Sequence, residues 1–100
     1  MLNIEKTVEA GKARFALEGR LDTLSSPALE RELEPVLSGL TELEFDLEKL
    51  EYVSSAGLRV LLFAAQTMEE QGELKVTHVS DDVMNIFTMT GLDEILHVEL

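Results

Sequence analysis

Four segments of this chain alternate apolar and polar residues with a period of two. In residues 43–48, for example, Leu43, Phe45 and Leu47 alternate with acidic residues. This pattern is typical of β-strands that bury one face, whereas a sheet covered by helices on both faces has unbroken apolar strands. We therefore expect one sheet with helices mainly on one face. The four segments are residues 2–6, 13–19, 43–48 and 74–79.

The first helical segment follows the second of these strands. Ser26 is the expected N-cap and Pro27 the first helical residue, a position where a missing N–H costs nothing. Pro35 is expected to kink or shorten the helix near its end. The apolar stripe of this helix consists of Leu29, Leu33, Val36 and Leu37.

Two further helical segments have start and stop signals of their own. The second begins among the small residues after Val53 and is expected to stop at Gly72. Ser80 is the expected N-cap of the third, and Gly91 its stop. Their apolar stripes are Leu58, Leu61, Leu62, Ala65 and Met68 in the second helix, and Val83, Ile86 and Phe87 in the third.

The elements are expected in the order β-β-α-β-α-β-α-β, with a last strand at His97–Leu100. The short E-A-G-K link predicts a hairpin of the first two strands. The β-α-β crossovers are expected to be right-handed and to make their strands parallel. The sheet is therefore mixed, and residues 1–100 are expected to form a single α/β domain, since no linker or repeat divides them.

Charge and composition narrow the choice of partners. The chain has 8 basic and 20 acidic residues, a net charge of −12, which disfavours nucleic acid and anionic membranes. This charge fits either simple solubility or attraction to a partner with a basic face. Without cysteine, a long apolar run or the regions of a signal peptide, we expect a cytoplasmic protein that does not insert into membranes.

Catalytic, metal and nucleotide sites lack their usual patterns. A serine nucleophile needs a base within hydrogen-bond reach, and only His78 and His97 are available, without a G-x-S-x-G sequence. No zinc, calcium or phosphate-binding pattern occurs either. We therefore expect no enzyme activity, no metal and no cofactor.

The stretch Y-V-S-S-A-G-L-R-V-L-L, residues 52–62, has two serines where a strand turns into a helix. One serine is explained as a helix cap, which contributes about 1 kcal/mol. A cap needs only one hydroxyl, however, and the end of a parallel strand is a common place for binding chemistry. The small Ala56 and Gly57 would let another protein approach closely. The pair is therefore either a cap alone or a cap beside a target for modification.

The chain resembles the anti-sigma factor antagonists, which are small single-domain members of the STAS fold. The resemblance rests on G-R-L-D (19–22), on the block L-E-F-D-L-E-K-L-E-Y-V-S-S-A-G-L-R-V-L-L (43–62), and on M-T-G-L-D-E-I (89–95). It covers essentially the whole chain.

The resemblance implies a phosphorylation-controlled partner switch. In this family the unphosphorylated antagonist binds an anti-sigma factor, often a serine kinase, which phosphorylates a serine at the start of the second helix and is then released. A serine phosphatase restores the first state. The family's motif is D-S-[ST]-G, and matching on Gly57 makes Ser55 the phosphorylation site, with Ser54 in place of the aspartate and as the alternative acceptor. The partner surface implied consists of Asp22, Ser54, Ser55, Ala56, Gly57 and Leu58.

Two other functions stay open at this point. The chain is alternatively a STAS subunit that docks constitutively in a transporter or signalling assembly. Small-molecule binding is the other, although no phosphate-binding motif supports it. Charged residues on the exposed faces of the strands favour a monomer.

Overall fold

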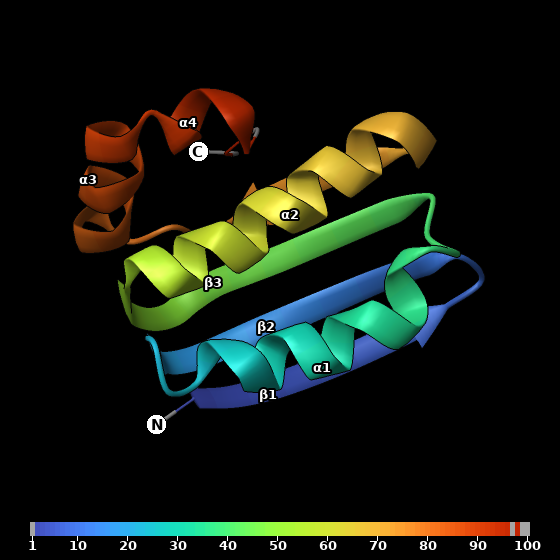
Figure 1. Cartoon of the computed structure of the whole chain (residues 1–100), viewed down its shortest axis with the longest axis horizontal. Helices are drawn as coiled ribbons and strands as arrows, with labels where there is room; N and C mark the ends of the chain where they lie inside the picture. Colours follow the sequence, from blue (N-terminus) through green and yellow to red (C-terminus); the bar gives the residue numbers. More distant parts are fainter. Residues whose placement is uncertain (1, 97, 99–100) are drawn as a thin grey trace.

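The computed structural model describes residues 2–96 and Val98 and consists of a four-stranded sheet with helices (Figure 1). The strands are β1 Leu2–Glu9, β2 Lys12–Leu21, β3 Glu42–Val53 and β4 Glu73–Thr77, in the spatial order β1-β2-β3-β4. The helices are α1 Ser26–Leu37, α2 Ser55–Gln71, α3 Asp81–Thr90 and the short α4 Leu92–Ile95. The expected mixed α/β sheet is confirmed.

Strand pairing follows from the connections. The hairpin of β1 and β2 is antiparallel and turns at Ala10 and Gly11, which both have positive φ, as a tight two-residue hairpin turn requires. The crossovers through α1 and α2 make β2 parallel to β3 and β3 parallel to β4. The carboxyl ends of β2 and β3 therefore lie side by side, with Leu21 paired to Val53.

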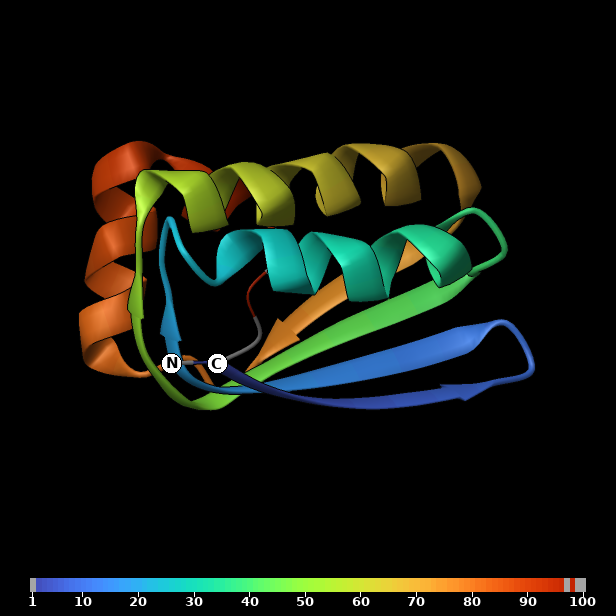
Figure 2. The ribbon, with the colours of Figure 1, turned by 60° about the horizontal axis from the view of Figure 1, so that its bottom comes forward.

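The helices cover one face of the sheet, as the strand pattern predicts. Figure 2 shows α1 and α2 lying along this face and α3 standing across one end of the sheet. The core between the two layers contains fully buried aromatic residues, and the rings of Phe15 and Phe45 lie 6.0 Å apart in a tilted arrangement. Phe87 of α3 is fully buried as well.

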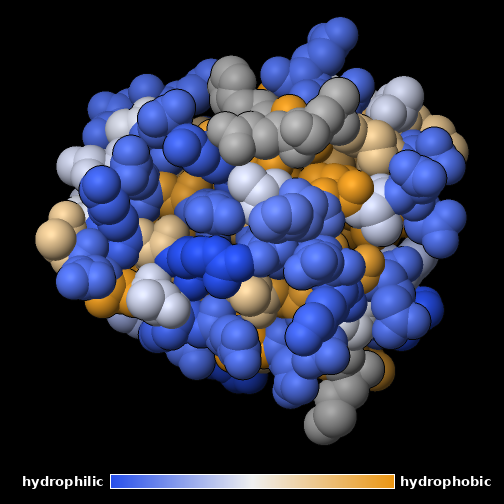
Figure 3. All heavy atoms as spheres, turned by 180° about the vertical axis from the view of Figure 1, so that it is seen from behind, coloured by the Kyte–Doolittle hydropathy of each residue, from blue (hydrophilic) through white to orange (hydrophobic). Residues whose placement is uncertain are grey.

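No helix in the described part of the chain covers the other face of the sheet (Figure 2), which is polar. Figure 3 shows this face, on which hydrophilic side chains predominate and apolar atoms are visible between them. Alternate residues of the strands point to it, so that Phe15 enters the core while Arg14 stays exposed. The alternation read from the sequence thus corresponds to one apolar and one solvated face.

The prediction for the start of α1 is wrong by one residue. The N-cap of α1 is Ser25, and Ser26 is the first helical residue, with its hydroxyl donating to Asp22 O at 2.5 Å. Pro35 lies inside α1, which continues only to Leu37. The last strand falls mostly outside the described residues, and Val98 forms a single parallel bridge with Val76.

The other helix boundaries agree with the prediction. Ser80 caps α3 by accepting a hydrogen bond from Val83 N at 3.3 Å, and Gly91 ends that helix with a left-handed φ of 77°. Gly72 ends α2, where its N–H donates to Met68 O at 2.8 Å.

Gly72 is required because the backbone of Thr41 approaches it closely. A Cβ at this position would contact the Thr41 carbonyl oxygen and lie 2.6 Å from the carbonyl carbon. Because backbone atoms give way only at the cost of local distortion, we expect Gly72→Ala to lower the free energy of unfolding by about 2 kcal/mol. Urea unfolding measures this loss. Gly39→Ala is the control, since the nearest atom to its Cβ would be 3.9 Å away. Equal stabilities of the two variants would contradict the close approach.

Candidate functional site

The start of α2 is joined to the end of β2 by a direct hydrogen bond. Ser54 follows the last residue of β3, and its backbone N–H donates to Leu21 O at 2.8 Å. The loop after β2 and the first turn of α2 consequently meet at the carboxyl ends of two parallel strands. Binding sites of α/β proteins commonly form at such an edge.

The two adjacent serines have different environments. Ser54 is the N-cap of α2, and its half-buried hydroxyl accepts a hydrogen bond from Gly57 N at 3.3 Å. Ser55 is the first helical residue and is exposed. Among the described residues its hydroxyl takes part in no hydrogen bond, so it is free to meet another molecule.

Gly57 and Leu58 lie beneath this surface. Both are buried, and a Cβ at Gly57 would lie 2.7 Å from Leu21 Cγ and 2.8 Å from Leu21 O. The small residue at position 57 thus permits the first turn of α2 to pack against the end of β2. Of the six residues expected to contact a partner, the accessible ones are Asp22, Ser54, Ser55 and Ala56.

Asp22 shapes the loop between β2 and α1. Its Oδ1 accepts hydrogen bonds from Ser25 N at 3.0 Å and Leu24 N at 3.1 Å, and the Ser25 hydroxyl lies 3.0 Å away. The backbone N–H of Ser25, followed by its hydroxyl, lowers the pKa of the Asp22 carboxyl below its ordinary value of 3.8. The carboxylate therefore holds the loop in a defined shape beside the start of α2.

A groove between α1 and α2 adjoins the exposed serine. It has a volume of about 370 Å³ and is lined by Pro27 and Glu30 of α1 and by Ala56, Arg59 and Phe63 of α2, among others. Phe63 is 48 % exposed. In the loop that precedes α1, Leu24 is 91 % exposed. Two large apolar side chains are thus exposed around this groove, and we call this part of the surface the serine side of the molecule.

Neither Leu24 nor Phe63 was identified from the sequence. Phe63 lies off the apolar stripe of α2, and this departure is the signal that would have revealed an exposed aromatic residue on that helix. Leu24 lies in a loop, where periodicity carries no information.

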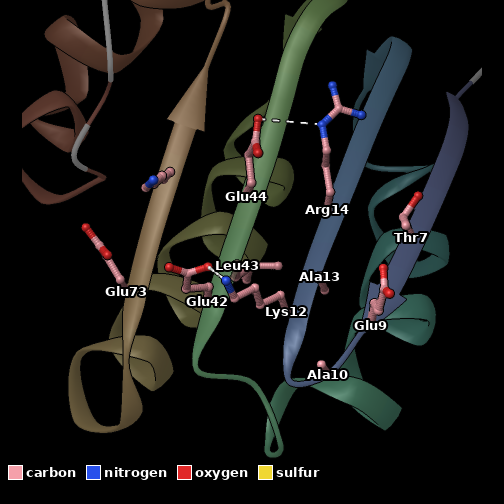
Figure 4. A pocket seen from close by; sticks show the side chains of 11 residues that line it. Thr7, Glu9, Ala10, Lys12, Ala13, Arg14, Glu42, Leu43, Glu44 and Glu73 are labelled. Carbon is pink, nitrogen blue, oxygen red and sulfur yellow. Dashed lines mark ion pairs between the residues drawn. The ribbon is translucent and has the colours of Figure 1, made fainter.

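A larger hollow lies on the uncovered face of the sheet (Figure 4). It has a volume of about 470 Å³ and is lined mainly by charged side chains. Lys12 pairs with Glu42 at 3.3 Å, and Arg14 Nε lies 3.6 Å from Glu44. The paired charges and the open shape are those of a solvated sheet surface. In the described part of the chain, no group of three or more His, Asp or Glu residues is arranged to hold a metal.

His78, one of the two bases considered for a serine hydrolase, lies away from the serines. Its Nδ1 is 3.2 Å from Oδ1 of Asp46. The same Oδ1 accepts a hydrogen bond from Glu48 N, and Oδ2 of Asp46 accepts one from Arg14. This cluster follows the uncovered face of the sheet, whereas Ser55 starts a helix on the opposite face. His97 lies outside the described residues. No helix among residues 2–96 is long and apolar enough to cross a membrane.

Known proteins share both the sequence pattern and the fold. The family model described as Mlab, STAS domain, matches residues 6–98. The anti-sigma-B factor antagonist of Staphylococcus aureus is 31% identical over 99 residues, which cover 97% of this chain and 92% of that protein.

Two solved structures superpose well. An anti-sigma factor antagonist from Mycobacterium paratuberculosis has a TM-score of 0.87 at 21% identity, covering 98% of this chain and 85% of that one. The Bacillus cell fate determinant SpoIIAA, in its phosphorylated form, has a TM-score of 0.75 at 17% identity, covering 100% and 92% of the two chains. At these identities the two structures show the fold alone.

The two serines are expected to differ in their effect on stability. Ser54→Ala removes the capping oxygen and is expected to lower the free energy of unfolding by about 1 kcal/mol. Ser55→Ala removes an exposed hydroxyl and is expected to change it by less than about 0.5 kcal/mol. Chemical denaturation of both variants measures the difference. A larger loss for Ser55→Ala would show that the cap is assigned to the wrong serine.

Asp22 is expected to stabilise the fold in a pH-dependent way. Because its pKa is lower in the folded chain, its contribution is complete above the ordinary value of 3.8 and is lost as the pH falls through the lowered pKa. The stability difference between the parent chain and Asp22→Ala should therefore be present at neutral pH and shrink in acid. Urea unfolding as a function of pH measures it, with Glu70→Ala, an exposed residue of α2, as control. A difference that stays constant into acid would contradict the role of the carboxylate.

Proposed function

Because the chain belongs to the STAS domain family and is similar to anti-sigma factor antagonists over nearly its whole length, we propose that it acts as a phosphorylation-controlled partner switch in the cytoplasm. Anti-sigma factor antagonists are regulators rather than enzymes. In the proposed cycle, the unphosphorylated chain binds an anti-sigma factor that is also a serine kinase. Phosphorylation of Ser55 releases this partner, and a serine phosphatase restores binding.

The observation that carries the proposal is the unequal exposure of the two serines. Ser55 presents on the first turn of α2 a hydroxyl that forms no hydrogen bond with any residue the structure describes, whereas the hydroxyl of Ser54 accepts one from Gly57 N. Modification of Ser54 would first have to break this capping bond. The exposed neighbour is therefore the better acceptor, and Ser54 is the alternative.

A phosphate at Ser55 would disturb a partner interface more than the domain itself. It adds about −1.5 to −2 charges at neutral pH, and a helix N-terminus accommodates negative charge. A closely fitted partner would instead have to desolvate the new charge. The solved structure of phosphorylated SpoIIAA has the same fold as this chain, which supports a switch that acts on the surface and leaves the fold unchanged.

The partner surface proposed here is wider than the serine loop. It comprises Asp22, Ser54, Ser55 and Ala56, with the exposed Leu24 and Phe63 as apolar anchors on the serine side of the fold. Covering these two side chains with a partner is favourable, because it removes apolar surface from water. Gly57 and Leu58 support the surface from below.

The switch predicts different effects for two substitutions of one residue. A partner captured from a lysate of the source organism with the Ser55→Ala variant would be identified and purified. It should bind Ser55→Ala like the parent chain, and Ser55→Asp at least about tenfold more weakly, because the carboxylate introduces a charge that the interface must desolvate. Isothermal titration calorimetry measures both affinities.

Two controls separate the switch from its alternatives. Incubation with the purified partner and ATP, followed by fragmentation mass spectrometry, should give a phosphate on Ser55 in the parent chain and none in Ser55→Ala. Equal binding of all variants, without phosphate on either serine, would reject the switch in favour of a STAS subunit that docks constitutively.

A further inference from the structure

Arg59 lies one helical turn beyond Ser55 on α2. Residues four apart on a helix are neighbours, with about 5–6 Å between their Cβ atoms. Both side chains are exposed, and among the described residues Arg59 takes part in no ion pair. The guanidinium is thus within reach of a group attached to the Ser55 hydroxyl.

The carboxylates of Glu30 and Asp22 form no ion pair with Arg59 among the described residues. Glu30 of α1 lines the same groove and forms no ion pair with Arg59 in the described part of the chain. The Asp22 carboxylate, in the loop that leads to α1, is turned toward Ser25 N and Leu24 N. Within residues 2–96, Arg59 therefore lies beside the proposed acceptor serine without a fixed anionic partner.

We propose that Arg59 captures the phosphate on Ser55 and is thereby withdrawn from the partner protein. This inference rests on the proposed function, because it concerns the phosphorylated state of the same site. An anion placed four residues before a cation is the favourable order on a helix. The planar guanidinium also donates two parallel hydrogen bonds to phosphate oxygens, which lysine does not.

Phosphorylation then changes the partner surface in two ways. It adds an anion at Ser55, and it removes Arg59 as a donor for the group that this residue meets in the complex. Since a guanidinium pairs best with a carboxylate, the partner is expected to place an Asp or Glu against Arg59. That carboxylate would be left unpaired, and close to a phosphate, once Ser55 is modified.

The capture can be tested without a kinase. Phosphoserine is incorporated at position 55 during synthesis of the full chain, and the phosphate is titrated by phosphorus-31 NMR. An adjacent guanidinium favours the dianion, so Arg59→Gln should raise the second phosphate pKa, ordinarily about 6, by roughly 0.3 relative to the parent phosphoprotein. Arg31→Gln is the matched control, because it removes the same charge from an exposed position of α1 that does not line the groove. Its titration should coincide with that of the parent.

Coincident titrations of the parent and Arg59→Gln would overturn the capture. Arg59→Lys keeps the charge and loses the paired hydrogen bonds, so its pKa should fall between the other two. In the unphosphorylated chain, Arg59→Gln should also weaken binding of the purified partner about threefold or more, whereas unchanged binding would reject the contact with a partner carboxylate. The proposed function fails separately, if the chain with phosphoserine at position 55 binds the partner as tightly as the unmodified chain.

Discussion

The close approach of α2 to the end of β2 is the constraint on which the site depends. Ser54 N donates to Leu21 O, and Gly57 packs so closely on Leu21 that a larger residue would displace it. These contacts fix the first turn of α2 relative to the β2–α1 loop, where Asp22 holds its own turn. The exposed hydroxyl of Ser55 therefore lies on a turn that is held by packing and hydrogen bonds. A segment held in this way favours recognition, because ordering it on binding costs less conformational entropy.

The two faces of the sheet have different roles. One face is buried under α1 and α2 and contains the aromatic core, while the other is charged and carries ion pairs such as Lys12–Glu42. Exposed ion pairs contribute little to stability, so we interpret this face as a solvated surface. The large apolar residues Leu24 and Phe63 are instead exposed on the serine side. The proposed recognition surface therefore lies where the β2–α1 loop and the start of α2 meet.

Periodicity and capping chemistry were sufficient to predict most of the fold. Period-two strands, Ser80 and Gly91 specified their elements because each acts through local geometry. The N-cap of α1 was misplaced by one residue, because both Ser25 and Ser26 are capable caps and only the hydrogen bonds of Asp22 distinguish them. The two adjacent serines were sufficient to predict where in the chain the candidate site lies. The sequence does not tell which serine hydroxyl is hydrogen-bonded, because this depends on the position of Gly57 N. Nor does it predict the exposure of Phe63, which depends on where α1 packs against α2.

The departure of this chain from the family's acceptor motif has a physical interpretation. Asp and Ser are both among the best N-cap residues, so Ser54 preserves the cap that the motif's aspartate would provide. What changes is charge, because a hydroxyl replaces a carboxylate directly beside Ser55, the proposed acceptor. A phosphate on Ser55 then meets one negative neighbour fewer, and Arg59 one turn later offers a positive one. Both differences favour the phosphorylated state of the domain itself. In the proposed switch, phosphorylation therefore weakens the complex with the partner rather than the fold of the domain.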